Sequence, residues 1–127
     1  MENNILITGG AGFIGSELIK LIKNKKRLII TDIKKDKKTI DNFKNKGIRY
    51  IQGNLNDKKF VKRVLRDVKI IFHLAGITKV PSTDENLNKK KEKRIFNNSV
   101  KIMKNLIKYS NLKQKIIFPS THLVFEN

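Results

Sequence analysis

Four glycines lie close together near the start of the chain, within the stretch "ITGGAGFIGSEL". The run from Gly10 to Gly15 satisfies the pattern G-x-G-x-x-G, and Gly9, Gly12 and Gly15 also satisfy G-x-x-G-x-x-G. In this pattern the first glycines permit a tight turn, the middle one lets a pyrophosphate approach the backbone, and the last permits close packing of a helix. Thr8 is placed to brace such a loop by hydrogen bonding. A tight strand-to-helix turn that binds nothing is the alternative.

Asp32 is a second candidate for the same chemistry, 17 residues beyond Gly15 at the end of an apolar run. An acidic side chain there accepts hydrogen bonds from the hydroxyls of an adenosine ribose. Its charge would repel a 2′-phosphate, so the pattern favours NAD over NADP. Lys34 and Lys35 follow directly and weaken that preference. A carboxylate that merely ends a strand is the alternative.

The elements that would position these residues alternate between strand-length apolar runs and helix-length amphipathic stretches. Predicted strands cover residues 4–8, 27–32, 48–52, 69–74 and 115–120, and predicted helices cover residues 13–23, 38–45, 57–66 and about 95–109. A Lys/Asn-rich loop is expected before the last helix. Continuous apolar strands are typical of a parallel sheet that is covered on both faces. We therefore predict an α/β fold of the Rossmann type: a doubly wound parallel sheet of five strands in the order 3-2-1-4-5, in one domain spanning residues 1–127.

The composition restricts the class of protein further. The 127 residues include 29 Lys and Arg against 11 Asp and Glu, a formal charge of +18, and no cysteine. Lacking cysteine, the chain has no disulfide or thiolate metal site, and neither a membrane-spanning run nor a secretory signal is visible, so we expect a cytoplasmic protein. The charge raises nucleic-acid binding as an alternative. Only five of the basic residues are Arg, and biased codon composition is the favoured explanation.

With these residues in place, the chain resembles the extended short-chain dehydrogenase/reductase family, specifically its NAD-dependent nucleotide-sugar epimerases and dehydratases. The resemblance rests on "ITGGAGFIGSEL", "GNLND", "FHLAG" and "IIFPSTHLVFEN". It implies that Thr121 takes the place of a catalytic Ser/Thr that hydrogen-bonds the reacting substrate oxygen. It also implies cofactor contacts from Gly9, Gly12, Phe13, Ile14, Gly15, Asp32, Asn54, Leu55, Leu74, Ala75 and Gly76. Asn54 stands where the family usually has an acid, and Phe125 and Glu126 replace the usual Tyr-Gly.

The same resemblance implies a cofactor-binding N-terminal part of a longer enzyme that acts on a nucleotide sugar. The family's catalytic Tyr-x-x-x-Lys pair would follow Asn127, and the substrate-binding lobe would follow that. Tyr109 and Lys113 match the pair in spacing but precede the fifth strand, so we predict that they lie at the edge away from the cofactor. His73 and His122 have no further ligand at metal-binding spacing, so no metal is expected. A homodimer, a non-catalytic NAD(P)-binding sensor or docking module, and a basic nucleic-acid-binding domain stay open as alternatives.

Overall fold

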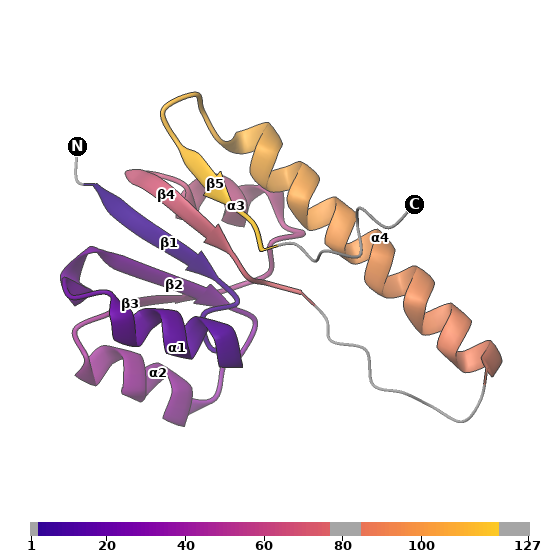
Figure 1. Ribbon diagram of the computed structural model, residues 1–127, viewed down its shortest axis with the longest axis horizontal. Coiled ribbons are helices and arrows are strands. Elements are labelled where there is room, and N and C mark those ends of the chain that lie inside the picture. Colours follow the sequence, from indigo (N-terminus) through magenta and orange to yellow (C-terminus); the bar gives the residue numbers. More distant parts are fainter. Residues whose placement is uncertain (1–2, 77–84, 120–127) are drawn as a thin grey trace.

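The chain forms one parallel sheet of five strands in the order β3-β2-β1-β4-β5 (Figure 1). It is seen in a computed structural model that describes residues 3–76 and 85–119. The strands are β1 (Asn4–Thr8), β2 (Leu28–Asp32), β3 (Arg49–Gln52), β4 (Val68–His73) and β5 (Lys115–Ile117). All neighbouring pairs are parallel. The predicted fold class and strand order are confirmed. Strand β5 ends at Ile117, earlier than predicted, because Phe118 and Pro119 do not continue the ladder.

Helices cover both faces of the sheet. The helices are α1 (Phe13–Leu21), α2 (Lys37–Asn45), α3 (Lys58–Val64) and α4 (Glu85–Tyr109), with a short 3-10 turn, η1 (Lys25–Arg27), before β2. Successive residues of β1 point to opposite faces. Leu6 therefore packs in one core cluster with Val61 of α3 and Leu106 of α4, and Ile7 packs in a second cluster with Ile19 of α1 and Phe43 of α2. This two-sided burial explains why the strands read as unbroken apolar runs.

Two of the helices begin at an aspartate that caps them. The Asp36 carboxylate accepts the Thr39 N–H at 2.9 Å at the start of α2, and Asp57 accepts the Lys59 N–H at 2.8 Å at the start of α3. These caps satisfy backbone donors that have no partner inside the helix. They fix where each crossover turns back toward the sheet, and hence where the carboxyl ends of the strands are exposed.

Helix α4 is longer than the sequence pattern indicated. It begins at Glu85, whereas the pattern predicted a start near Ile95 after a loop, so the basic run at residues 89–94 is helical. Lys, Glu and Arg form helices readily, but residues 85–94 contain one apolar residue, Leu87, and therefore show no apolar period. Figure 1 shows this end of α4 projecting beyond the sheet. Within the described residues, no helix, α4 included, is long and apolar enough to cross a membrane.

We predict that two adjacent residues of α4 respond very differently to truncation. Leu106 is fully buried in the cluster beneath α3 and α4, whereas Ile107 is 60% exposed. Leu106→Ala should cost ~2–5 kcal/mol of unfolding free energy because it leaves a cavity, and Ile107→Ala should cost less than about 0.5 kcal/mol. Urea denaturation measures both. Equal effects would show that α4 does not pack on the sheet through this face.

Candidate cofactor-binding cleft

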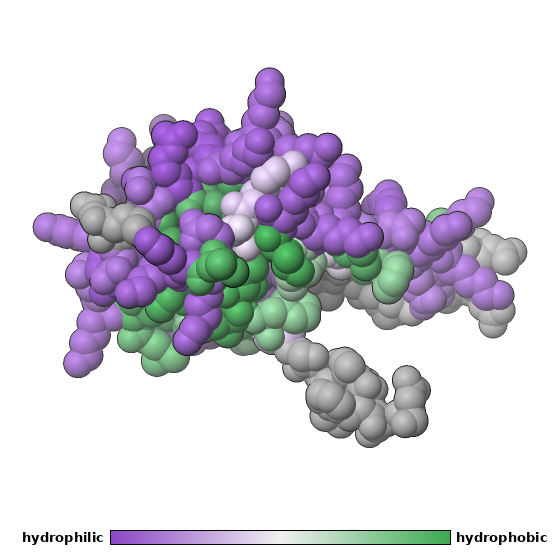
Figure 2. All heavy atoms as spheres, turned by 90° about the horizontal axis from the view of Figure 1, so that it is seen from above, coloured by the Kyte–Doolittle hydropathy of each residue, from purple (hydrophilic) through white to green (hydrophobic). Residues whose placement is uncertain are grey.

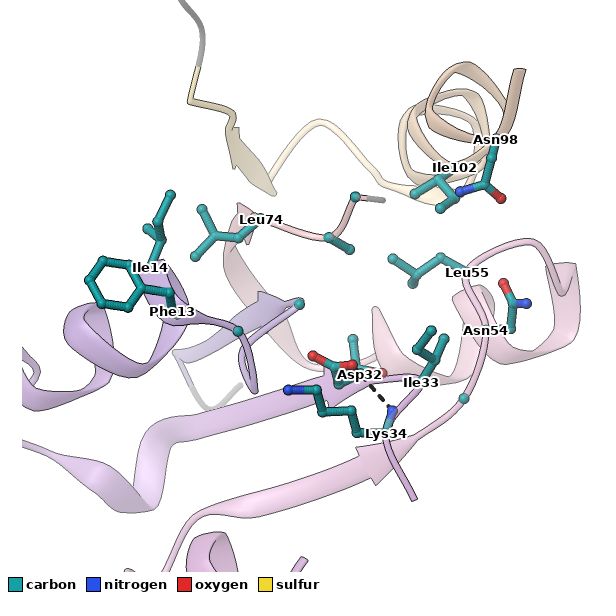
Figure 3. A pocket seen from close by; sticks show the side chains of 17 residues that line it. Phe13, Ile14, Asp32, Ile33, Lys34, Asn54, Leu55, Leu74, Asn98 and Ile102 are labelled. Carbon is teal, nitrogen blue, oxygen red and sulfur yellow. Dashed lines mark hydrogen bonds between the residues drawn. The ribbon is translucent and has the colours of Figure 1, made fainter. Parts of the chain in front are cut away.

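A cleft of about 560 Å³ opens at the carboxyl ends of the central strands (Figure 3). Its walls come from the glycine loop after β1 and from the segments that follow β2, β3 and β4. One face of α4 completes it, through Asn98 and Ile102. Ligands of open α/β sheets bind at this edge, next to the point where the strand order reverses. Every residue that the resemblance assigned to the cofactor lines this cleft. Thr121, which was assigned to the reacting substrate oxygen, lies outside the described residues.

The absence of a side chain has different consequences at Gly15 and at Gly12. A Cβ on Gly15 would lie 2.6 Å from the Cα of Gly10, so this glycine permits close packing of helix and loop. Its close neighbour is thus the loop backbone and not strand β1 itself. At Gly12, by contrast, an added Cβ would meet only the Gly9 carbonyl oxygen, at 3.2 Å, and the backbone is extended. A Cβ at Gly12 thus needs only a shift of this one oxygen by a few tenths of an ångström, and the rest of the space beside Gly12 is open.

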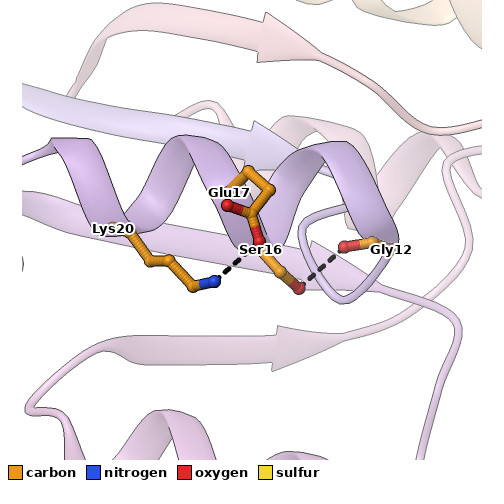
Figure 4. A network of polar contacts seen from close by, with 4 residues as sticks. All are labelled: Gly12, Ser16, Glu17 and Lys20. Carbon is orange, nitrogen blue, oxygen red and sulfur yellow. Dashed lines mark hydrogen bonds and ion pairs between the residues drawn. The ribbon is translucent and has the colours of Figure 1, made fainter.

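The first turn of α1 faces the cleft with free backbone donors. Gly12 is the N-cap and has no side chain to accept their hydrogen bonds. The Gly12 carbonyl accepts both the Ser16 N–H, at 3.0 Å, and the Ser16 hydroxyl, at 2.7 Å (Figure 4). The Phe13 and Ile14 side chains are 83% and 61% exposed at this end of the cleft. Unpaired N–H groups and the helix dipole together favour a phosphate here.

The Asp32 carboxylate joins the glycine loop to the end of β2. One oxygen, Oδ2, accepts the Ala11 N–H at 3.1 Å, and the other, Oδ1, accepts the Lys34 N–H at 3.2 Å (Figure 3). A carboxylate offers about four acceptor positions, so each oxygen retains one for a ribose hydroxyl. Spacing alone predicted the ribose contact but gave no sign of the bond to Ala11.

The loop after β3 supplies a polar and an apolar residue to the cleft. The Asn54 side chain is exposed and its Oδ1 accepts the Asn56 N–H at 2.9 Å, whereas Leu55 is 5% exposed and joins the core. The loop is held against α4, because Asn56 Nδ2 donates to Asn98 Oδ1 at 2.7 Å and Asn105 Nδ2 donates to the Leu55 carbonyl at 2.9 Å. Asn98 was missed from the sequence. The available signal was its spacing of seven residues from Asn105, which places both amides on one side of the helix.

The segment after β4 forms the opposite wall, and Thr8 holds it in place. The Thr8 carbonyl accepts the Leu74 N–H at 3.1 Å, and the Thr8 hydroxyl accepts the Ala75 N–H at 3.2 Å. Gly76 is exposed and a Cβ there would meet nothing within 4 Å. Thr8 therefore braces the wall after β4, whereas the sequence had suggested that it braces the glycine loop.

His73 is buried against Thr8. The Thr8 hydroxyl lies 2.7 Å from His73 Nδ1. A hydroxyl has one donor and two acceptor positions, so this bond fits either tautomer of the ring while the same oxygen accepts the Ala75 N–H. The ring is 2% exposed, and burial lowers the pKa of His73 below its usual value. His73 thus supports the cleft wall through Thr8.

The two remaining groups singled out in the sequence lie elsewhere. Tyr109 is the last residue of α4, and nearby Gln114 donates to the carbonyls of Leu65 and Val68, where β4 begins. This is the edge of the sheet opposite the cleft, as predicted for the Tyr109–Lys113 pair. His122 lies outside the described residues. Among residues 3–76 and 85–119, no three His, Asp or Glu side chains converge as a metal site would require.

The strand order and the cleft define the dinucleotide-binding α/β class of protein, with a glycine loop at the reversal point. Comparison with known proteins gives the family. A sequence model of the 3-beta hydroxysteroid dehydrogenase/isomerase family matches residues 6–127, and the chain belongs to that family.

Its relatives include enzymes of sugar nucleotides and of steroids. A UDP-N-acetyl-alpha-D-glucosaminuronate decarboxylase from Bacillus cytotoxicus is 33% identical over 98% of this chain and 38% of its own length. A 3 beta-hydroxysteroid dehydrogenase/Delta 5-->4-isomerase from Vaccinia virus is 36% identical over 58% of this chain and 22% of its own. A crystal structure of a UDP-glucose 4-epimerase matches with a TM-score of 0.75 and 26% identity, covering 98% of this chain and 37% of its own. The chain thus spans between 22% and 38% of these proteins.

The burial of His73, which lowers its pKa, predicts a loss of stability in mild acid. A folded-state pKa below the unfolded value of about 6.5 means that the unfolded chain binds the extra proton as pH falls through about 6.5. Between pH 7.5 and 5.5 the unfolding free energy should fall by up to ~1.4 kcal/mol per pH unit from this group. His73→Gln should flatten that part of the pH dependence. His122→Gln is the matched control. An equal flattening of the pH dependence in that variant would show that the loss of stability does not come specifically from His73.

Proposed function

We propose that this chain binds NAD and is the cofactor-binding part of a cytoplasmic, NAD-dependent enzyme that acts on a nucleotide sugar. The observation that carries the proposal is the cleft, because it collects phosphate-binding, ribose-binding and apolar groups at one edge of the sheet. The solved structures with the same fold include a UDP-glucose 4-epimerase from Brucella ovis in complex with NAD, at 21% identity. That likeness supports the fold on which the proposal rests.

Different residues of the cleft would contact different parts of the cofactor. The N–H groups at the start of α1, beside the open space at Gly12, would hold the pyrophosphate. Asp32 would accept the hydroxyls of the adenosine ribose, and Leu55 with Asn54 would border the adenine. The backbone of residues 74–76, held by Thr8, would lie along the nicotinamide-side ribose. When bound, NAD would supply a hydride acceptor for a substrate carbon.

The substrate class is inferred from the relatives and from the segment after β5. The Bacillus cytotoxicus decarboxylase and an inverting UDP-N-acetylglucosamine 4,6-dehydratase of Campylobacter jejuni, by their names, act on UDP sugars. Thr121 is the proposed hydrogen-bond donor to the reacting substrate oxygen. We propose cofactor binding for this chain. Turnover would depend on residues in the part of the longer relatives that this chain does not match.

We predict that Gly12→Val abolishes NAD binding and leaves the fold intact. The added side chain enters the space beside the pyrophosphate site, and its Cβ would have one protein atom within 4 Å, the Gly9 carbonyl oxygen at 3.2 Å. Titration calorimetry with NAD and NADH measures the affinity, and thermal melting without ligand measures the stability. Unchanged NAD affinity in a folded variant would remove the glycine loop from the proposed site.

Gly15→Ala is the matched control for the glycine loop. Its Cβ would lie 2.6–2.9 Å from backbone atoms of Gly10, so the variant should lower the melting temperature before any ligand is added. Gly12→Val should therefore lose NAD binding, whereas Gly15→Ala should lose stability. The same result in both variants would mean that any added side chain in the loop has the same effect, whatever its position.

We predict that the chain prefers NAD to NADP because of Asp32, and that Asp32→Ala shifts the ratio of the NAD affinity to the NADP affinity toward NADP by about tenfold. The variant removes the repulsion of a 2′-phosphate. It also removes the acceptor of the Ala11 N–H, so the absolute affinity for both cofactors should fall. The ratio, obtained by calorimetry with each cofactor, is therefore the informative quantity.

Asp36→Asn provides the control for net charge. It removes one negative charge four residues away and retains a side-chain oxygen for the cap of α2. The affinity ratio should not change in this variant. Tighter binding of NADP than NAD by the unaltered chain would overturn the assignment of Asp32.

A further inference from the structure

We infer that the projecting end of α4 binds duplex DNA through its phosphate backbone. The surface concerned is the basic run at residues 89–94, in which Glu92 is the one residue that is neither Lys nor Arg. Further along the same helix, Asn98 and Ile102 line the cofactor cleft. The run is thus a second surface beside the cleft, and the inference does not depend on the proposed function.

The basic run is helical and lies away from the sheet. Helix α4 begins at Glu85, and Figure 1 shows its first turns projecting beyond the strands. Four side chains of the run are exposed: Lys89, Lys90, Lys93 and Arg94. A rod of helix with its cations exposed is therefore available to a partner that the cleft could not admit.

The four exposed side chains form two rows along the helix. Lys89 and Lys93 are four residues apart, so they lie on one side of α4, about 6 Å apart along its axis. Lys90 and Arg94 form the second row with the same spacing. The rows are separated by about 100° around the helix, because each residue turns the chain by that angle. Two rows of cations match a partner that presents anions on two sides.

The major groove of B-DNA presents anions in this way. The groove is about 12 Å wide and admits an α-helix, whose diameter with side chains is about 10–12 Å. The backbones of the two strands border the groove, so each row of cations would face one of them. Lysine binds phosphate as a point charge, whereas arginine is the usual reader of base edges. Because the run holds four Lys and one Arg, we expect binding that is independent of sequence.

Electrostatics within the free chain also favours a polyanionic partner. Both rows are like-charge pairs at i and i+4, which destabilise a helix. A bound duplex would remove that repulsion and release its own counterions. Anionic lipid would supply charge as well, but a helix at a membrane surface buries an apolar face. The first ten residues of α4 offer Leu87 alone for such a face, so the duplex is favoured over the bilayer.

The experiment separates the position of the charge from its amount. One variant replaces three residues of α4 with Gln, namely Lys90, Lys93 and Arg94. The control replaces three residues of α2, on the other face of the sheet and equally exposed, namely Lys37, Lys38 and Lys44. Each variant removes three charges from a chain of charge +18, so a general attraction of the whole chain falls equally in both.

Three measurements are made on the unaltered chain and on both variants. Fluorescence anisotropy measures binding to two labelled duplexes of about 20 base pairs and unrelated sequence, between 0.05 and 0.2 M salt. Co-sedimentation measures binding to phosphatidylserine vesicles. Thermal melting checks that each variant is folded, and the α4 variant should melt no earlier than the unaltered chain because its like-charge pairs are gone.

We expect the unaltered chain to bind both duplexes equally and to lose affinity steeply as salt rises. The α4 variant should weaken binding by about tenfold or more at 0.1 M salt and reduce the slope of log K against log salt by about 2–3. The α2 variant should weaken binding by less than about threefold. Equal losses in the two variants would overturn the inference, because net charge alone would then explain the binding. No binding to either duplex, or binding to the vesicles and not to the duplexes, would overturn it as well.

Discussion

The arrangement of this molecule depends on hydrogen bonds that continue the sheet beyond the last residue of β1. The Gly9 N–H donates to the Thr31 carbonyl of β2 at 2.8 Å, and the Thr8 carbonyl accepts the Leu74 N–H, beyond the end of β4, at 3.1 Å. The neighbouring strands are thus tied together where the central strand ends, and their loops leave the sheet from one edge. Backbone groups buried at this edge need such partners. A cleft between the loops is the geometric consequence.

Gly9 is the residue that makes this continuation compatible with a turn. Its φ of +67° lies in the left-handed region, and a Cβ would lie 2.7 Å from the backbone of Ala75. The chain can therefore reverse immediately after bonding to β2, while the segment after β4 passes close beside it. Helix α1 then begins at the same edge as Asp32, so that its free N–H groups and the carboxylate face a single space. The placement of these polar groups around one space thus depends on the left-handed backbone conformation of Gly9.

The sequence predicted those parts of the molecule that obey a local rule. The apolar runs gave the five strands, and βα alternation gave their order, because right-handed crossovers leave few other topologies. The glycine spacing predicted the loop that lines the cleft through Gly9 and residues 12–15. The first ten residues of α4 were missed because Leu87 is the single apolar residue among them, so this part of the helix shows no apolar period. The bond from Ala11 to Asp32 was also missed. It joins two loops 21 residues apart, and no pattern within either one encodes it.

The basic charge of the chain is a separate matter from the charge of the cleft. Hydrophilic residues cover most of the face seen in Figure 2, around a smaller apolar area. The excess of Lys and Arg over Asp and Glu attracts polyanions in general, and salt screens that attraction over about 10 Å. Within the cleft, Asp32 and Lys34 form a local pair of opposite signs on either side of Ala11. Groups within hydrogen-bond reach of a ligand can distinguish ligands of equal charge, because the attraction of the whole chain's net charge is the same for each of them.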